Sequence, residues 1–81
     1  MQVTVRLFAR LRDITGAGEL KREAPAGANV HAVWSSLVAD YPALAAYETS
    51  ISCAVNEDYS RFSAAVAEGD EVAFLPPVSG G

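Results

Sequence analysis

The chain has 81 residues, of which 51% are hydrophobic and 20% charged, with a formal net charge of −4. This length allows a single domain with a small core, and this composition is typical of a globular chain and not of a disordered one. Its six Lys and Arg residues are scattered along the sequence without forming a basic stripe, so we expect no nucleic-acid partner.

The sequence also carries no sign of export, membrane insertion or metal binding. No apolar run is long enough to span a bilayer, and the first nine residues alternate in polarity instead of forming a signal-peptide core. Cys53 is the only cysteine and His31 the only histidine. One thiol cannot form an internal disulfide, and with one imidazole it is too small a set for a metal site. We expect a cytoplasmic domain that binds no metal, cofactor or membrane.

The first part of the chain predicts two strands joined by a short helical turn. Apolar and polar residues alternate over residues 3–7, the pattern of a strand with one buried face. Residues 9–15 favour a short helical turn that Gly16 ends. Residues 19–24 are polar and extended, with charges that discourage pairing to another sheet. The sequence therefore predicts that 19–24 forms an edge strand.

The middle of the chain predicts the main helix. Asn29 is a suitable N-cap, and Pro42 disfavours helical geometry in the residue before it, so the helix should end near residues 40–41. Between them, apolar residues follow the helical spacing i, i+3, i+4, i+7 and i+8. These residues are Val30, Val33, Trp34, Leu37 and Val38. We expect this stripe, with Trp34, to face the core, while His31 lies on the surface.

The second half predicts further strands and then a tail. Residues 42–50 form a connection whose Leu44 and Tyr47 fold back on the core. The expected elements after it are a buried strand over 51–55, a turn over 56–58, a short strand around Tyr59, a turn at Gly69-Asp70 and a last strand over 72–75. Cys53 lies in the first of these strands and is expected in the core. This order predicts an α+β domain over residues 1–75, with one main helix on a mixed sheet of four to five strands and a flexible tail over 76–81.

The tail is the one segment with evident chemistry. Pro76 and Pro77 end the strand and favour a stiff extended backbone, and six extended residues reach at most about 20 Å. Gly80 and Gly81 then place no side chain beside the terminal carboxylate, so the end fits a narrow tunnel. A carboxylate with a pKa of about 3.3–3.7 is ionised and a poor electrophile at neutral pH, and must be activated, for example as an acyl-adenylate. Because the chain has no Gly-rich phosphate loop, another protein must supply that activation.

The strand pattern also predicts a docking face. If Val3, Val5 and Leu7 face the core, Phe8 projects to the opposite side, where Leu75 also points. Together with Tyr59 these side chains predict an exposed apolar patch for partner proteins, and the tail residues Pro76, Pro77, Val78 and Ser79 continue it. The alternative is that Phe8 and Tyr59 merely cover the edges of the sheet.

Two segments give the chain a family resemblance. Residues 69–81, Gly-Asp-Glu-Val-Ala-Phe-Leu-Pro-Pro-Val-Ser-Gly-Gly, and residues 5–12, Val-Arg-Leu-Phe-Ala-Arg-Leu-Arg, resemble the small subunits of molybdopterin synthase, the MoaD-type sulfur carriers. Ala54-Val55-Asn56 lies where that family has its middle strand. The resemblance covers the whole chain and implies a β-grasp, ubiquitin-like fold.

The resemblance further implies a mechanism and partners. An E1-like adenylyltransferase uses Mg-ATP to adenylate Gly81, and a sulfur donor converts the adenylate to a thiocarboxylate. The tail then enters the large subunit of molybdopterin synthase, in a heterotetramer, and gives its sulfur to the pterin precursor. The chain itself is then a sulfur donor and not an enzyme. Three alternatives stay open: a carrier for thiamine thiazole, cysteine or tRNA thiolation, a ubiquitin-like protein modifier, and a binding module with an inert tail.

Overall fold

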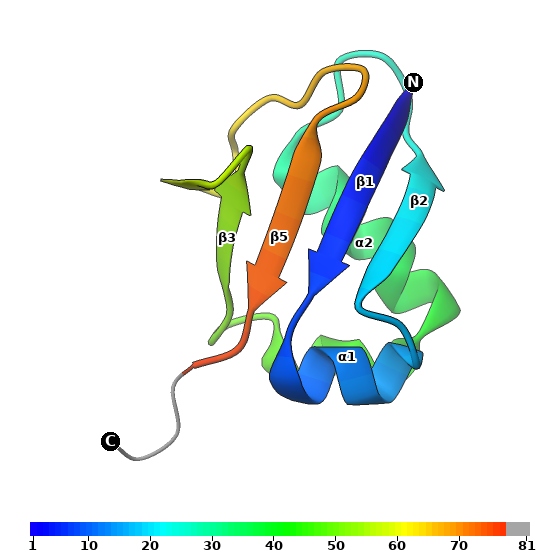
Figure 1. Ribbon diagram of the computed structural model, residues 1–81, viewed down its shortest axis with the longest axis vertical. Coiled ribbons are helices and arrows are strands. Elements are labelled where there is room, and N and C mark those ends of the chain that lie inside the picture. Colours follow the sequence, from blue (N-terminus) through cyan, green and yellow to red (C-terminus); the bar gives the residue numbers. More distant parts are fainter. Residues whose placement is uncertain (78–81) are drawn as a thin grey trace.

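The computed structural model describes residues 1–77 and shows one five-stranded mixed sheet with helices packed against it (Figure 1). In chain order the elements are β1 (Gln2–Leu7), α1 (Ala9–Thr15), β2 (Glu19–Glu23), α2 (Val30–Asp40), the 3-10 helix η1 (Pro42–Tyr47), β3 (Ser52–Val55), β4 (Asp58–Ser60) and β5 (Glu71–Leu75). The strand order is β2-β1-β5-β3-β4, in which β1 and β5 are parallel and the other pairs antiparallel. The predicted α+β arrangement is confirmed, with five strands.

The core lies between the sheet and α2, which crosses one of its faces (Figure 1). Alternate residues of β1 and β5 point into it, because side chains on a strand alternate between faces. The fully buried side chains are Val3, Val5, Leu7, Leu11, Val30, Val33, Trp34, Leu37, Leu44, Cys53, Val72 and Phe74. The Trp34 and Phe74 rings pack with centroids 5.0 Å apart. The predicted core positions of Trp34 and Cys53 are confirmed.

Local signals in the sequence mark the helix ends as predicted. Gly16 ends α1 with a left-handed φ of 77°, which glycine adopts without steric cost. The side-chain oxygen of Asn29 accepts a hydrogen bond of 2.9 Å from the backbone N–H of Ala32 and so caps α2. Both expected helix boundaries are confirmed.

The segment after α2 is more ordered than the sequence indicates. Within the predicted connection over 42–50, Pro42–Tyr47 forms the 3-10 helix η1. Proline suits the first turn of a helix because its missing N–H has no partner there. Leu44 is fully buried and Tyr47 half-buried, so the prediction that both fold back on the core is confirmed. This helix brings Tyr47 close to the end of β5, where it lines one hollow with Leu75.

The β3–β4 hairpin closes through a two-residue turn. Asn56 and Glu57 have φ values of 50° and 72°. Positive φ at both central residues defines a type I′ turn, whose twist matches that of the flanking strands. Asparagine tolerates this region, whereas glutamate adopts it with steric strain.

Replacing Glu57 with glycine should therefore stabilise the protein. The Glu57→Gly variant has the favoured Asn-Gly turn, and relief of the left-handed strain outweighs the extra chain entropy of glycine by about 0.5–1 kcal/mol. Urea unfolding followed by fluorescence of the single tryptophan measures the change. Lower stability in this variant would contradict the assigned turn. Ser63→Gly, at another exposed position, serves as the control.

A small polar network ties this hairpin to the turn before β5. The Asp70 carboxylate accepts hydrogen bonds from the Asn56 side-chain amide at 3.0 Å and from the backbone N–H of Ala67 at 2.8 Å. The Asn56 side-chain oxygen in turn accepts from the backbone N–H of Glu71 at 3.0 Å. The bonds from Asn56 and then Ala67 lower the pKa of Asp70, because they favour its charged form. The network fixes the register between two loops far apart in sequence.

The lowered pKa of Asp70 makes its contribution to stability depend on pH. A carboxyl group whose pKa is lower in the folded state stabilises the fold above its unfolded pKa of about 3.9, and this contribution disappears as the pH falls through the folded pKa. Asp70→Asn should thus be less stable than the parent chain at pH 7, and the gap should narrow by pH 3. Urea midpoints at the two pH values test this, and a gap of equal size at both would refute it.

Candidate docking face and tail root

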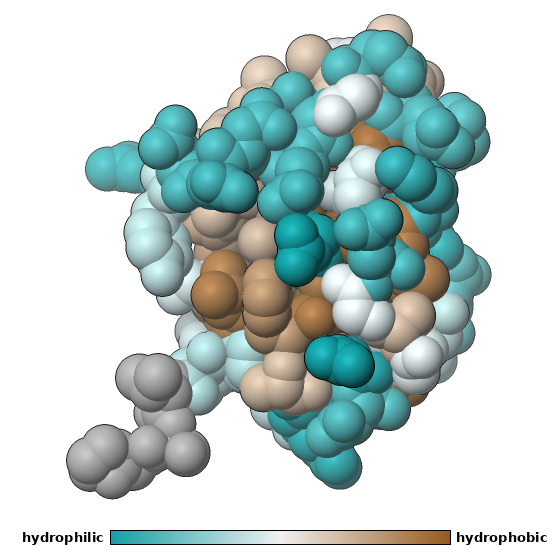
Figure 2. Space-filling view, viewed as in Figure 1, coloured by the Kyte–Doolittle hydropathy of each residue, from teal (hydrophilic) through white to brown (hydrophobic). Residues whose placement is uncertain are grey.

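The face of the sheet opposite α2 carries the predicted apolar patch. Phe8 and Tyr59 are exposed by 38% and 78%, the large exposed hydrophobic residues of the described chain. Both line a hollow of about 310 Å³ together with Leu75. Figure 2, which views this face, shows hydrophobic side chains gathered over the lower parts of β3 and β5. The sheet therefore brings Phe8, Tyr59 and Leu75 to one surface, as the strand pattern predicts.

Two alanines form the floor of this hollow. Ala54 of β3 lies opposite Ala73 of β5, and each is flanked across the strands by Tyr59 or Arg6. Ala54 is only 7% exposed, yet it does not belong to the core cluster behind the sheet. It lies on the solvent face, where it lines the hollow between larger neighbours. Small residues in the floor and larger ones in the walls give the hollow the shape of a socket.

Charged side chains stand around the rim of the hollow. Arg6 pairs with Glu71 at 3.8 Å, and its guanidinium lies 5.6 Å from the centre of the Phe8 ring. Glu57 lies on the same rim. An apolar centre with a polar rim is the usual anatomy of a protein–protein interface.

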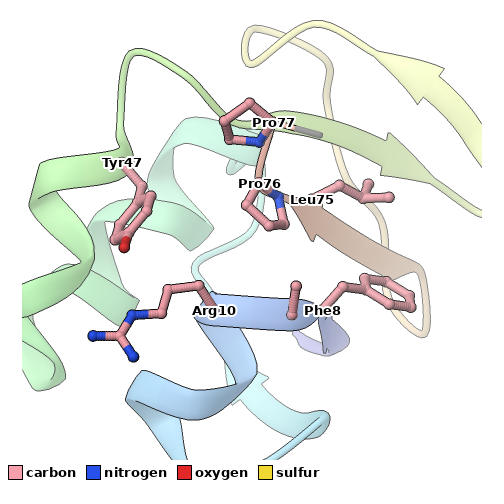
Figure 3. Close-up of a pocket in the computed structure, with 7 residues that line it drawn as sticks. Phe8, Arg10, Tyr47, Leu75, Pro76 and Pro77 are labelled. Carbon is pink, nitrogen blue, oxygen red and sulfur yellow. The ribbon is translucent and has the colours of Figure 1, made fainter. Parts of the chain in front are cut away.

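A second, larger hollow lies where the tail leaves the sheet. Its volume is about 550 Å³, and it is lined by Phe8, Ala9, Arg10, Tyr47, Leu75, Pro76 and Pro77. In Figure 3 Phe8 and Arg10 lie on opposite sides of Pro76, and Tyr47 of η1 lies on the same side as Arg10. Because Phe8 and Leu75 line both hollows, the docking face continues around the end of β5.

These two hollows contain the predicted docking residues that the structure describes, namely Phe8, Tyr59, Leu75, Pro76 and Pro77. The predictions for Val78, Ser79, Gly80 and Gly81 lie outside the described residues. Arg10 and Tyr47 are additional members that sequence reasoning missed. The small residues Ala54 and Ala73 were missed as a floor, although the register of β3 and β5 places them there.

The remaining polar residues form no reaction centre within residues 1–77. Burial raises the pKa of the Cys53 thiol, and its sulfur donates to the backbone oxygen of Ser60 at 3.1 Å, so it is a poor nucleophile. His31 is exposed, as predicted. In this part of the chain no three His, Cys, Asp or Glu side chains gather to hold a metal. None of its helices has the length and apolar character needed to cross a membrane.

The sheet order, the helix across one face and the exit of β5 into a tail define a ubiquitin-like β-grasp domain. The model of the ThiS family matches residues 5–81, and the chain belongs to that family.

Similar proteins have been described as sulfur carriers. The molybdopterin synthase sulfur carrier subunit of Arabidopsis thaliana is 37% identical over 100% of this chain and 84% of its own. That of Chlamydomonas reinhardtii is 36% identical, with full coverage of both chains.

Solved structures extend the comparison. The small archaeal modifier protein 1 of Methanosarcina acetivorans is 33% identical, with a TM-score of 0.83 over 99% of this chain and 96% of that one. A chain in the BexX/CysO complex of Amycolatopsis orientalis is 30% identical, with a TM-score of 0.73 over 98% and 99%. The fold therefore occurs both in proteins named as modifiers and in complexes with a partner protein.

Proposed function

We propose that this chain is the sulfur-carrier small subunit of a molybdopterin synthase. The observation that carries the proposal is the junction of an apolar sheet face with the root of a tail ending in Gly80-Gly81. A carrier needs both parts: a surface that partners hold, and a chemical end that projects beyond it. The full-length likeness to two sulfur carrier subunits supports molybdopterin as the product.

The chemistry of the carrier takes place at Gly81. Its carboxylate attacks the α-phosphorus of ATP on the activating enzyme, which holds Mg-ATP, and pyrophosphate leaves. A sulfide equivalent from the donor then attacks the carbonyl carbon, and AMP leaves to give the thiocarboxylate. In the large subunit this sulfur attacks an electrophilic carbon of the pterin precursor and displaces an oxygen substituent there, which gives a thioester between the carrier and the pterin. Water then cleaves the acyl–sulfur bond, which leaves the sulfur on the pterin as a thiolate and returns the Gly81 carboxylate. The chain thus delivers sulfur without releasing free sulfide, and the enzymes supply the catalysis.

The docking face supplies affinity and register for these encounters. Phe8, Tyr59 and Leu75 present apolar surface at the centre, where interface energy concentrates. An apolar side chain of the partner fits the socket over Ala54 and Ala73. The same face serves the activating enzyme and the large subunit, because the single tail leaves from its edge. A heterotetramer of two carriers and two large subunits is the expected assembly.

A protein modifier is the second candidate. The likeness to small archaeal modifier protein 1 favours it, since the same activated Gly81 can acylate a lysine amine and release AMP. Carriers for thiamine thiazole, cysteine or tRNA thiolation use the same thiocarboxylate and differ only in the acceptor.

Intact mass spectrometry separates these functions. The chain is incubated with an E1-like adenylyltransferase, ATP and a sulfur donor, and a carrier gains the mass difference of sulfur over oxygen. The thiocarboxylated chain is then mixed with a molybdopterin synthase large subunit and the pterin precursor, and formation of the dithiolene is measured. If the free chain shows no replacement of oxygen by sulfur and conjugates to other proteins appear on a denaturing gel, the result supports the modifier instead. A thiocarboxylate that a competent large subunit does not consume points to another sulfur pathway.

A further inference from the structure

The larger hollow lies at the tail root, the residues Pro76 and Pro77 with which the tail leaves the sheet. Its lining has one charged group and is otherwise apolar. Arg10 is exposed at the start of α1, and within residues 1–77 it forms no ion pair. Around it lie apolar side chains and the ring of Tyr47. By contrast, Arg6 on the sheet face is already paired with Glu71. Arg10 is therefore a cation beside apolar surface with its hydrogen-bonding capacity unused by the described chain.

The length of the remaining tail determines what covers this hollow. Four residues follow Pro77, and they extend at most about 14 Å. An enzyme that reacts with the Gly81 carboxylate must hold it in an enclosed site, so its own surface lies within that distance of Pro76 and Pro77. The tail root is consequently beneath the partner whenever the chemistry occurs.

The backbone at Ala9 positions the two sides of the hollow. Ala9 has a φ of 51°, in the left-handed region that costs a residue with a Cβ about 1–2 kcal/mol. At this start of α1, Phe8 lies on one side of Pro76 and Arg10 on the other (Figure 3). Strained backbone of this kind persists where the surrounding structure requires it, often at functional sites. Here the strained backbone of Ala9 separates Phe8, which belongs to the sheet face, from Arg10 on the other side of the tail.

We propose that this hollow is a second docking site, which receives an apolar side chain of the activating enzyme next to an acidic one that pairs with Arg10. The inference rests on the proposed function and extends it, because Phe8 and Leu75 join the hollow to the sheet face. The partner then holds the tail from both sides. The guanidinium offers planar paired donors that match a carboxylate, which makes Arg10 a residue of partner specificity.

Binding measured without nucleotide tests the inference. The dissociation constant of the E1-like adenylyltransferase is determined by calorimetry for the parent chain, Arg10→Glu and Arg61→Glu. Arg61 is also exposed and lines neither hollow, and Arg61→Glu has the same net charge as Arg10→Glu. We expect Arg10→Glu to weaken binding at least tenfold and Arg61→Glu to change it less than twofold. Raising the salt concentration should weaken binding of the parent chain more than that of Arg10→Glu.

The outcomes separate this inference from the proposed function. If Leu75→Asp abolishes binding while Arg10→Glu binds like the parent, the sheet face docks and the second site is wrong. If Arg10→Glu binds normally without nucleotide but is adenylated more slowly, Arg10 contacts the ATP phosphates and the inference is again overturned. If the parent chain binds neither the adenylyltransferase nor a large subunit, the proposed function itself fails. Unfolding curves confirm that each variant is folded.

Discussion

A chain lacking Gly81 should fold normally and lose at least about 100-fold in the rate of thiocarboxylate formation. The deletion leaves a terminal carboxylate on Gly80 but moves it back by one residue, about 3.3–3.6 Å. A displacement of even 1 Å from the productive position can cost about 100-fold in rate. The residues that form the described core end at Phe74, well before the tail. We therefore expect the unfolding free energy to stay within about 0.5 kcal/mol of the parent value.

The Gly81→Ala variant distinguishes the effect of tail length from the effect of side-chain size in the partner's tunnel. This variant keeps the length of the tail and adds a single methyl group beside the carboxylate, in the position where a narrow tunnel accepts only glycine. Intact mass after incubation with the adenylyltransferase, ATP and sulfur donor measures both variants at several times. Full conversion of the truncated chain would contradict the carrier and the modifier together, since both require the Gly81 carboxylate.

The alternation of side chains in strands explains why the fold and much of the docking face were predictable. Val3, Val5 and Leu7 face the core, so the next residue, Phe8, must face the solvent side, and the same rule assigns Leu75. Asn29 and Gly16 mark helix ends through their own local chemistry. Such features depend on neighbours in sequence, which the amino-acid order contains.

The tail-root hollow was not predictable, because it depends on contacts between distant segments. Tyr47 reaches it through η1, a 3-10 helix whose apolar residues show no clear period. Arg10 reaches it through the left-handed backbone of Ala9, a conformation that alanine rarely adopts. The link from Asn56 to Asp70 likewise joins residues 14 apart in sequence. Only the tertiary arrangement places these groups together.

Neighbouring residues of β5 should separate stability from docking. Phe74 is fully buried, and its ring packs against Trp34 at 5.0 Å and Phe62 at 6.2 Å between centroids. Phe74→Ala removes most of a large aromatic side chain and leaves a cavity, which costs about 3–5 kcal/mol. The free energy of unfolding of a native protein is about 0.05–0.15 kcal/mol per residue, which gives roughly 4–12 kcal/mol for a chain of this length. The variant should therefore lose a large part of this free energy, and its urea midpoint should fall well below that of the parent chain.

Leu75→Ala changes the adjacent residue on the opposite face. Leu75 is half-buried and lines both hollows, so we expect a loss of only about 1 kcal/mol in stability together with clearly weaker partner binding. Urea unfolding followed by Trp34 fluorescence gives the stabilities, and calorimetry with the adenylyltransferase gives the affinities. A Phe74→Ala chain as stable as the parent would mean that the core closes around the missing ring. Normal partner binding by Leu75→Ala would instead show that Leu75 is not part of the docking face. The alternation of side chains along β5, which buries Phe74 and turns Leu75 to the other face, would then not be enough to identify docking residues.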